Sequence, residues 1–556
     1  MKQAVSAIVL FVVVAALTGW LRQPVIDEAF CDPDLAGAVY SAQELLLGGD
    51  LYGDTVETKP PLSYLMFAGL FALFGKSMKV IYLYSALWHL AVAVVLFFLA
   101  RSILSTGAGV LAAIFYAFFS ASNSTNGPCP NFETWTLLPT ALGFWFLWRA
   151  SRGRWHVNLA AAGICAGVSL LAKQNVVVMP LLALPWLWFA LEHENEKRAK
   201  VRKLIAGVGV ATVGALLPIV FAALFFAARG QLGSLWNSLH PGAAVSYMSS
   251  EAAIFLWERM RVTGGDFLWQ FLPVVPMIGA LIAAFAVPLV DKPKASQILG
   301  YRLIAVWLVA AFAAVVVGTK FFDHYFILLT PPLAAGAGIG VWALAFRTKW
   351  PRAVGVVLIV VTIALVAFAF RWEWRIATKA AVDRVKIGRL QWKEDGDYFW
   401  FRSNLPRYMS WSHWLERVGR CTRENTTPAD GIYVWDYEPG IYWFADRRAP
   451  TKHFMYFNVA VEQPDDQGRW YGDESPQVRR NRAELLAELH AHPPAYIVTY
   501  KQAPSGEFRY HRKRPAPFFP ALAEWVESFY ERDMDCSNLY LQAYRRKKVR
   551  HTSEIN

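Results

Sequence analysis

A polar segment between two apolar runs is rich in carboxylates. It reads DEAFCDPDLAGAVYSAQELLLGGDLYGDTVE and covers residues 27–57. Its acidic residues include Asp27, Glu28, Asp32, Asp34, Asp50, Asp54 and Glu57. A carboxylate within hydrogen-bond reach of a hydroxyl can take its proton, and it works better when its pKa is raised towards the working pH. Asp34 also precedes a helix-like run at 35–49, so a helix N-cap is the alternative role for this residue.

Cationic and acidic side chains recur at the ends of later apolar runs. Glu133 lies in PCPNFETW, where it either serves a site or favours a helix N-terminus through the dipole. Each lysine alone could be snorkelling to lipid headgroups. Together with the acidic loop, the cationic set indicates a site for a phosphate-bearing lipid that is attacked by a hydroxyl. The set consists of Lys59, Lys173, Lys320 and His324.

The composition identifies the setting of these residues. The chain has 556 residues, 55% of them hydrophobic, and 24 tryptophans, with a mean hydropathy of +0.29. These values and the long apolar runs predict a polytopic helical membrane protein. The net charge of +13 does not require nucleic acid, because most basic residues outside the last third lie in short loops between apolar runs.

The apolar runs predict about eleven transmembrane helices. The first lacks a small-residue cleavage site and is expected to stay uncleaved. With the N-terminus inside, every strongly basic short loop falls inside, including 149–154 and 196–203. The predicted outer segments include 22–80, 123–133, 228–266, 319–324 and everything after about 372. The runs are 4–21, 81–100, 107–122, 134–149, 157–172, 176–191, 204–227, 267–290, 303–318, 325–346 and 353–371.

The stretch TKPPLSYLMFAGLFALFGKSMK at 58–79 is expected not to span. Only about 15 apolar residues precede Lys76, fewer than the roughly 20 that a span needs. Counting it as a span would also move the basic loops 149–154 and 196–203 outside. We therefore predict a juxtamembrane helix on the outer leaflet, begun by Pro60 and Pro61.

The segment after residue 372 predicts a second domain of α/β type, at 372–556. Strand-like GIYVWDY and AYIVTY alternate with helix-like RNRAELLAELHA and PALAEWVESFYERD. An odd number of spans places this domain outside. Cys31 and Cys129 fall in outer loops and Cys421 and Cys536 in the tail, so two disulfides, 31–129 and 421–536, are permitted in an oxidising compartment.

Five ordered segments resemble the GT-C glycosyltransferases of the protein mannosyltransferase and lipid A aminoarabinose transferase type. They are DPDLAGAVYSAQELLLGGDLY, ETKPPLSYL, NFETW, LLAKQ and DHYFILLTPPLAAGAG. With the topology, the resemblance covers roughly residues 1–370. It implies inverting transfer of a sugar from a polyprenyl-phosphate carrier to a hydroxyl of a glycan, lipid or protein in the cell envelope.

The resemblance also implies roles for the site residues. The family's aspartate falls on Asp34, with Asp32 completing a D-x-D pair. Asp27 and Glu28 match the family's D-E pair in letters but lie about seven residues early, so the identity of the base stays open. Lys59, Lys173, Lys320 and His324 would bind the donor phosphate. Glu57, Glu133 and Asn131 would hold the acceptor or a divalent metal ion, with the metal, at Glu57, an open alternative because Thr58 separates Glu57 from Lys59.

Other interpretations of the sequence remain open. An oligosaccharyl transferase or ligase would share the fold, and a lipid-linked sugar flippase or transporter would share the membrane setting. A receptor or scaffold would leave the acidic loop and the lysines unexplained. In the tail, Asp436 or Arg447 could touch an acceptor, although structural roles are expected. The compact architecture suggests a bacterial inner membrane, with the N-terminus cytoplasmic and the tail periplasmic.

Overall fold

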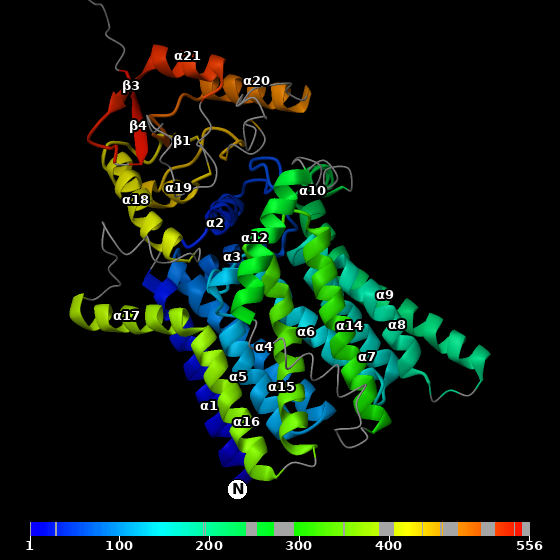
Figure 1. The fold of residues 1–556 in the computed structure, drawn as a ribbon. Coiled ribbons are helices and arrows are strands. Elements are labelled where there is room, and N and C mark those ends of the chain that lie inside the picture. The colour runs from blue at the N-terminus through cyan, green and yellow to red at the C-terminus, as the bar shows by residue number, and fades with distance from the viewer. Residues whose placement is uncertain are drawn as a thin grey trace, which may run out of the picture.

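The computed structural model describes most of the chain. The described residues are 2–27, 30–192, 194, 196–240, 253–271, 294–348, 351–387, 405–435, 437–455, 459, 476–501, 518–538 and 540–547. They form a helical bundle with a smaller mixed domain above it (Figure 1). The predicted fold class, a multi-pass helical membrane protein with a C-terminal domain containing a sheet, is confirmed.

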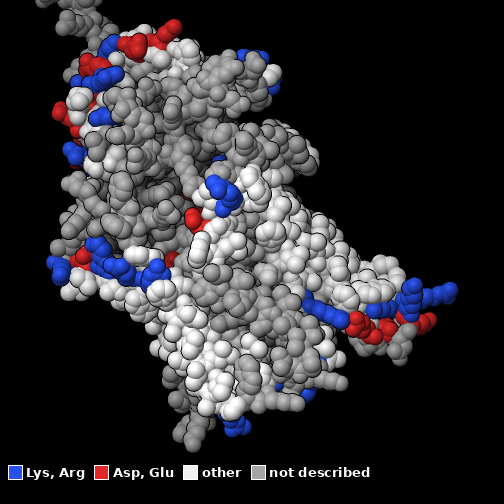
Figure 2. All heavy atoms as spheres, viewed as in Figure 1, with Lys and Arg blue, Asp and Glu red and all other residues white. Residues whose placement is uncertain are grey.

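Ten of the eleven predicted apolar runs form helices in the described part of the bundle. Six described helical segments, 78–103, 155–172, 197–228, 295–317, 323–346 and 352–369, are long and apolar enough to cross a membrane. Figure 2 shows little charge on the described flank of the bundle, which suits contact with lipid. The helices are α1 (Lys2–Arg22), α4 (Met78–Ile103), α5 (Thr106–Phe119), α6 (Phe132–Ala150), α7 (Trp155–Ala172), α8 (Val178–Ala190), α9 (Lys197–Ala228), α14 (Ala295–Val317), α15 (Thr330–Phe346) and α16 (Arg352–Ala369).

The expected boundary between an outer loop at 228–266 and a span at 267–290 falls inside a described helix, and the place where the membrane begins stays a prediction. The described part of this region holds α10 (Leu232–Leu239) and α12 (Ala253–Phe271), and α12 runs through residue 267 without a break. Phe267 and Phe271 are buried and stack at 4.3 Å between ring centroids, so packing extends the helix across the polar-to-apolar boundary. Residues 272–290 lie outside the described part.

The first polar segment folds into short helices at the top of the bundle. They are η1 (Gln23–Asp27), α2 (Pro33–Leu46) and α3 (Leu62–Phe74). Helix α3 has 13 residues, or about 20 Å of rise, which is too short to cross the roughly 30 Å hydrocarbon core. It ends at Gly75, whose φ of +80° suits glycine. This length agrees with a stretch that does not span, and its place at the membrane surface stays a prediction.

Further short helices connect the spans near the same end. They are η2 (Asn123–Thr125), η3 (Gln174–Val177) and η4 (Asp323–Leu329). η3 directly follows Lys173, and η4 contains His324. The chain ends that follow α5, α7 and α14 therefore meet the segment that contains α2.

The C-terminal domain has a four-stranded sheet in the order β1-β2-β4-β3. β1 and β2 are parallel, and the other neighbours are antiparallel. The predicted helix 520–533 is partly wrong, because its last four residues form β3 and pair with β4. The elements are α17 (Arg371–Ile387), α18 (Leu405–Glu424), β1 (Ile432–Val434), α19 (Gly440–Ala445), α20 (Pro476–Ala491), β2 (Tyr496–Tyr500), α21 (Pro520–Phe529), β3 (Tyr530–Asp533) and β4 (Leu541–Arg546).

The C-terminal domain rests directly on α2 (Figure 1). The Tyr40 ring stacks on Phe454 at 4.5 Å between centroids, and the Tyr40 hydroxyl accepts a hydrogen bond of 2.9 Å from the Ala449 amide. The Arg448 guanidinium donates to both carboxylate oxygens of Glu44. Aromatic stacking and a two-point ion pair therefore fix α2 against this domain.

Both permitted disulfides are present. Cys31 is bonded to Cys129 and joins the segment before α2 to the segment before α6. Cys421 is bonded to Cys536 and joins α18 to the turn before β4. The remaining cysteine, Cys165, is a buried thiol in α7.

Replacing Cys421 and Cys536 together with Ala should lower the free energy of unfolding of the C-terminal domain by about 2–5 kcal/mol, because the unfolded chain gains freedom. Thermal unfolding of the purified full chain in non-reducing buffer measures the change. Reducing agent should lower the midpoint of the wild type at least as far, since it also breaks Cys31–Cys129. Cys165→Ala keeps both disulfides and should match the wild type with and without reducing agent. Equal midpoints for wild type and double variant would contradict the disulfide.

Candidate active site

Asp32 begins α2 as its N-cap. One carboxylate oxygen accepts a hydrogen bond of 2.7 Å from the Asp34 amide. The other accepts from the side-chain amides of Asn126 at 2.9 Å and Asn131 at 3.3 Å. Burial, followed by the nearby Asp34 charge, raises the pKa of Asp32. Asp32 and Asn131, predicted to serve catalysis and acceptor binding, thus hold the first two outer segments together.

Asp34 lies in the first turn of α2 and faces a group of cations. Its carboxylate is 3.4 Å from the Lys59 ammonium and 3.8 Å from Nε2 of His324. Burial raises the pKa of Asp34, but the charges of Lys59, His324 and Lys173 outweigh burial and leave the pKa below its ordinary value. Asp34 keeps 17% of its side chain exposed, so it is accessible to a substrate.

A second ion pair lies beside the first. Glu133, in the first turn of α6, is 2.8 Å from the ammonium of Lys173, which follows the end of α7. Nε2 of His324 is 3.9 Å from the other oxygen of Glu133. The sequence prediction that Lys59, Lys173 and His324 converge with Asp34 and Glu133 therefore agrees with the geometry.

Aromatic rings lie beside the ammonium groups of both lysines. The Lys59 ammonium lies 4.5 Å from the Phe132 ring centroid, and the Lys173 ammonium lies 5.7 Å from the same centroid. Lys173 also lies 4.9 Å from the Tyr325 ring. Such contacts stabilise partly desolvated ammonium groups. Phe132 and Tyr325 thus line the charge cluster, although the sequence did not single them out.

Asp323 fixes the orientation of His324. Its carboxylate accepts the His324 backbone amide at 2.8 Å and lies 3.3 Å from Nδ1 of the ring. Nε2 consequently points to the gap between Asp34 and Glu133. Sequence reasoning missed Asp323, although it precedes His324 directly in the segment DHYFILL.

Lys320 is buried in the turn that leads to η4. The turn is tight, because Thr319 and Phe321 have φ values of 57° and 47°. The Lys320 carbonyl accepts a hydrogen bond of 2.9 Å from Arg259, whose guanidinium lies 4.6 Å from the Phe322 ring centroid. Arg259 comes from α12 and was also missed by sequence reasoning. Its only signal was a basic residue within a predicted outer loop.

Glu57 is not arranged as a metal ligand. One carboxylate oxygen accepts from the Ser41 hydroxyl at 2.7 Å and the other from the Tyr64 hydroxyl at 2.6 Å. Burial raises the pKa of Glu57. Within the described ranges, no three His, Cys, Asp or Glu side chains are grouped to hold a metal ion. The metal alternative at Glu57 therefore has no supporting ligand group among the described residues.

The loop that carries Lys59 is held by its main chain. The Tyr52 hydroxyl donates to the Lys59 carbonyl at 2.9 Å, and the Gln174 side-chain amide donates to the Thr58 carbonyl at 2.9 Å. The Val56 amide donates to the Lys452 carbonyl of the C-terminal domain. These bonds fix where the Lys59 ammonium can reach.

The structure describes the remaining predicted residues only in part. Asp27 is described through its backbone, as the last residue of η1, while Glu28 and Asp436 lie outside the described residues. The Arg447 guanidinium donates to the carbonyls of Asp446 and Thr426, which gives it a structural role in the C-terminal domain.

Comparisons with known proteins point to one fold. Residues 58–234, less than half of the chain, match the family described as dolichyl-phosphate-mannose-protein mannosyltransferase. A search of curated proteins found no significant sequence match. The predicted resemblance to the GT-C superfamily is confirmed at the level of fold by the following solved structures.

ArnT from Cupriavidus metallidurans in the apo state has 13% sequence identity and a TM-score of 0.60, over 98% of each chain. The same protein bound to undecaprenyl phosphate gives 13% identity and a TM-score of 0.58, over 97% of this chain and 98% of that one. The apo oligosaccharyltransferase of Archaeoglobus fulgidus gives 12% identity and a TM-score of 0.51, over 89% of this chain and 69% of that one.

Asp32→Ala should destabilise the protein. The change removes the helix cap, worth about 1 kcal/mol, and leaves two buried amides without an acceptor, at about 1–3 kcal/mol each. Thermal unfolding of the full chain should show a clearly lower midpoint. Asp54→Ala, at an exposed acid of the same segment that accepts one hydrogen bond, from the Asp50 amide, is the comparison and should lower the midpoint less. A wild-type midpoint for Asp32→Ala would refute the capping role.

Proposed function

We propose that this chain, whose fold is that of the GT-C membrane glycosyltransferases, is an inverting transferase that moves a single sugar from a polyprenyl-phosphate donor to a hydroxyl acceptor. The observation that carries the proposal is the partly exposed pair of Asp34 and Lys59, which lies beside the buried pair of Glu133 and Lys173. Such a cluster offers an acceptor for a hydroxyl proton and fixed positive charge for a leaving phosphate.

The donor phosphate would lie between Lys59 and Lys173. Both ammonium groups lie near the ring of Phe132, so one phosphate could reach both. Transfer converts a phosphodiester with one negative charge into a phosphomonoester whose second pKa is about 6. The cations would stabilise the charge that builds on the departing oxygen as the sugar–phosphate bond breaks. The structural similarity to a protein crystallised with undecaprenyl phosphate supports this class of donor.

Asp34 would take the proton of the acceptor hydroxyl. In the structure without substrate, the cations keep its pKa low, which makes it a weak base. A bound phosphate competes for Lys59 and adds a negative charge nearby, and both changes raise the pKa of Asp34. The acceptor oxygen then attacks the anomeric carbon, the polyprenyl phosphate leaves with the bonding electron pair, and the proton stays on Asp34.

The orientation in the membrane is part of the proposal. We infer that residues 1–371 form the transmembrane domain and 372–556 a periplasmic domain of a bacterial inner-membrane protein, with the N-terminus in the cytoplasm. Two observations support this. The short basic loops 149–154 and 196–203 fall together on the predicted inner side. Both disulfides lie in segments predicted to be outside, where an oxidising compartment preserves them.

Asp34→Asn should reduce sugar transfer by about 10²–10⁴-fold, since the amide cannot accept the proton. The assay is transfer of radiolabelled sugar from a panel of polyprenyl-phosphate sugars to membrane glycan acceptors by the purified full chain. Asp54→Asn, in the same segment but outside the cluster, is the control and should retain activity. Loss with Asp27→Asn and not with Asp34→Asn would move the base to Asp27.

Other outcomes of this assay separate the rival functions. Transfer of a whole oligosaccharide with no transfer of a single sugar would overturn the single-sugar assignment in favour of an oligosaccharyl transferase. Movement of a labelled lipid-linked sugar across the bilayer, with no carrier turned over, would overturn the enzyme and favour a flippase.

The pH dependence of kcat/KM for the donor, which reports the enzyme before the donor binds, should report the charges around Asp34. Because its pKa lies below the ordinary aspartate value, the ionised form persists on acidification, and the acid limb of the wild type should lie below about pH 4. Lys59→Gln removes a cation that lowers this pKa, so its acid limb should move to higher pH. Lys76→Gln, at an exposed lysine paired with Asp446, is the control. An acid limb that does not move in Lys59→Gln would disprove the coupling.

A further inference from the structure

The basic residues in the first turns of α9 lie on two faces of the helix. Lys200 is 9% exposed, and its ammonium lies 4.1 Å from the Trp188 ring centroid. Lys203 lies 3.3 Å from the Glu194 carboxylate. These two lysines are therefore satisfied by the protein.

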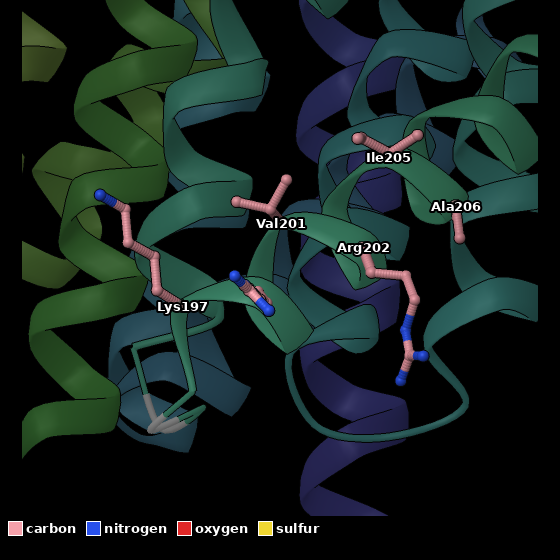
Figure 3. Close-up of a pocket in the computed structure, with 6 residues that line it drawn as sticks. Lys197, Val201, Arg202, Ile205 and Ala206 are labelled. Carbon is pink, nitrogen blue, oxygen red and sulfur yellow. The ribbon is translucent and has the colours of Figure 1, made fainter.

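The other three cations face outwards. Lys197, Arg198 and Arg202 are exposed and line an open pocket of about 760 Å³ (Figure 3). In the part of the chain that the structure describes, none of these three forms an ion pair with a carboxylate. The rest of the pocket wall is apolar and consists of Val201, Ile205 and Ala206.

The same helix continues as an exposed apolar surface. Ile205 is 66% exposed, and Phe221, more than four turns further on, is 71% exposed. Only 11% of an apolar 18-residue stretch of α9 is buried inside the protein. Along one helix, therefore, the unpaired cations lie next to an exposed apolar surface. Val201 and Ile205, about 6 Å of rise apart, begin this surface, which suits contact with acyl chains.

We propose that this pocket binds the phosphate headgroup of an anionic phospholipid, with its acyl chains along the exposed side of α9. Charge complementarity selects the headgroup, because guanidinium groups form two-point hydrogen bonds with phosphate oxygens. Continuity with the apolar surface selects a lipid over a soluble anion. Basic pockets beside transmembrane helices recognise anionic lipids in this way. The inference is independent of the proposed transferase reaction.

The test uses the delipidated full chain in a nonionic detergent. Binding of phosphatidylglycerol and of phosphatidylcholine is measured by native mass spectrometry over a lipid titration. The variant K197Q/R198Q/R202Q should bind phosphatidylglycerol at least ten-fold more weakly than wild type. R149Q/R152Q/R154Q removes the same charge from another predicted inner loop, and it should change this affinity less than two-fold.

Each contrary result overturns the proposal. Equal weakening in the two triple variants would show diffuse attraction to basic loops rather than a built pocket. Equal affinity of the wild type for phosphatidylcholine would exclude recognition of an anionic headgroup. Displacement of phosphatidylglycerol by low millimolar inorganic phosphate would assign the pocket to a soluble anion. Thermal unfolding and size-exclusion profiles of each variant confirm that a weaker binder is folded.

Discussion

Burying charge at the top of the bundle is possible only when each charge faces its opposite. Asp34 faces Lys59, and Glu133, whose side chain has no exposed surface, faces Lys173. An isolated buried ion would cost several kcal/mol or more, and the pairs offset this only while their geometry holds. The four charges come from three separated parts of the chain. The fold around them must therefore be rigid, and much of the outer segment serves that requirement.

Three independent restraints hold α2 in place. At its start, Asp32 binds the side chains of Asn126 and Asn131, and the Cys31–Cys129 bond lies next to it. In its middle, Ser41 binds Glu57, which in turn fixes the loop leading to Lys59. Along its outer side, Glu44 binds Arg448 of the C-terminal domain. The C-terminal domain thus contributes to the site by positioning the helix that carries Asp34, without supplying a described residue to the charge cluster itself.

The sequence predicted what depends on composition and order along the chain. Apolar runs identify the helices because lipid requires them, and short basic loops constrain which ends lie together. These two signals were enough to predict that Lys59, Lys173 and His324 lie near Asp34. It could not show that Asp32 would cap a helix rather than face a substrate, because both roles need an aspartate at that place. Asp323 and Arg259 were missed because their roles depend on which side chain or carbonyl they face after folding.

The balance of charge suggests why Asp34 is a weak base in the structure without substrate. Asp34, Glu133, Lys59 and Lys173 sum to zero, and the Asp323–His324 pair adds no net charge when the ring is protonated. A donor phosphate would add a negative charge that Lys59 must share with Asp34. In the proposed reaction, Asp34 then becomes a stronger base only when the donor is bound. An acceptor or a water that arrives first meets a carboxylate whose proton affinity is low, and this couples activation of the hydroxyl to the presence of the sugar that it attacks.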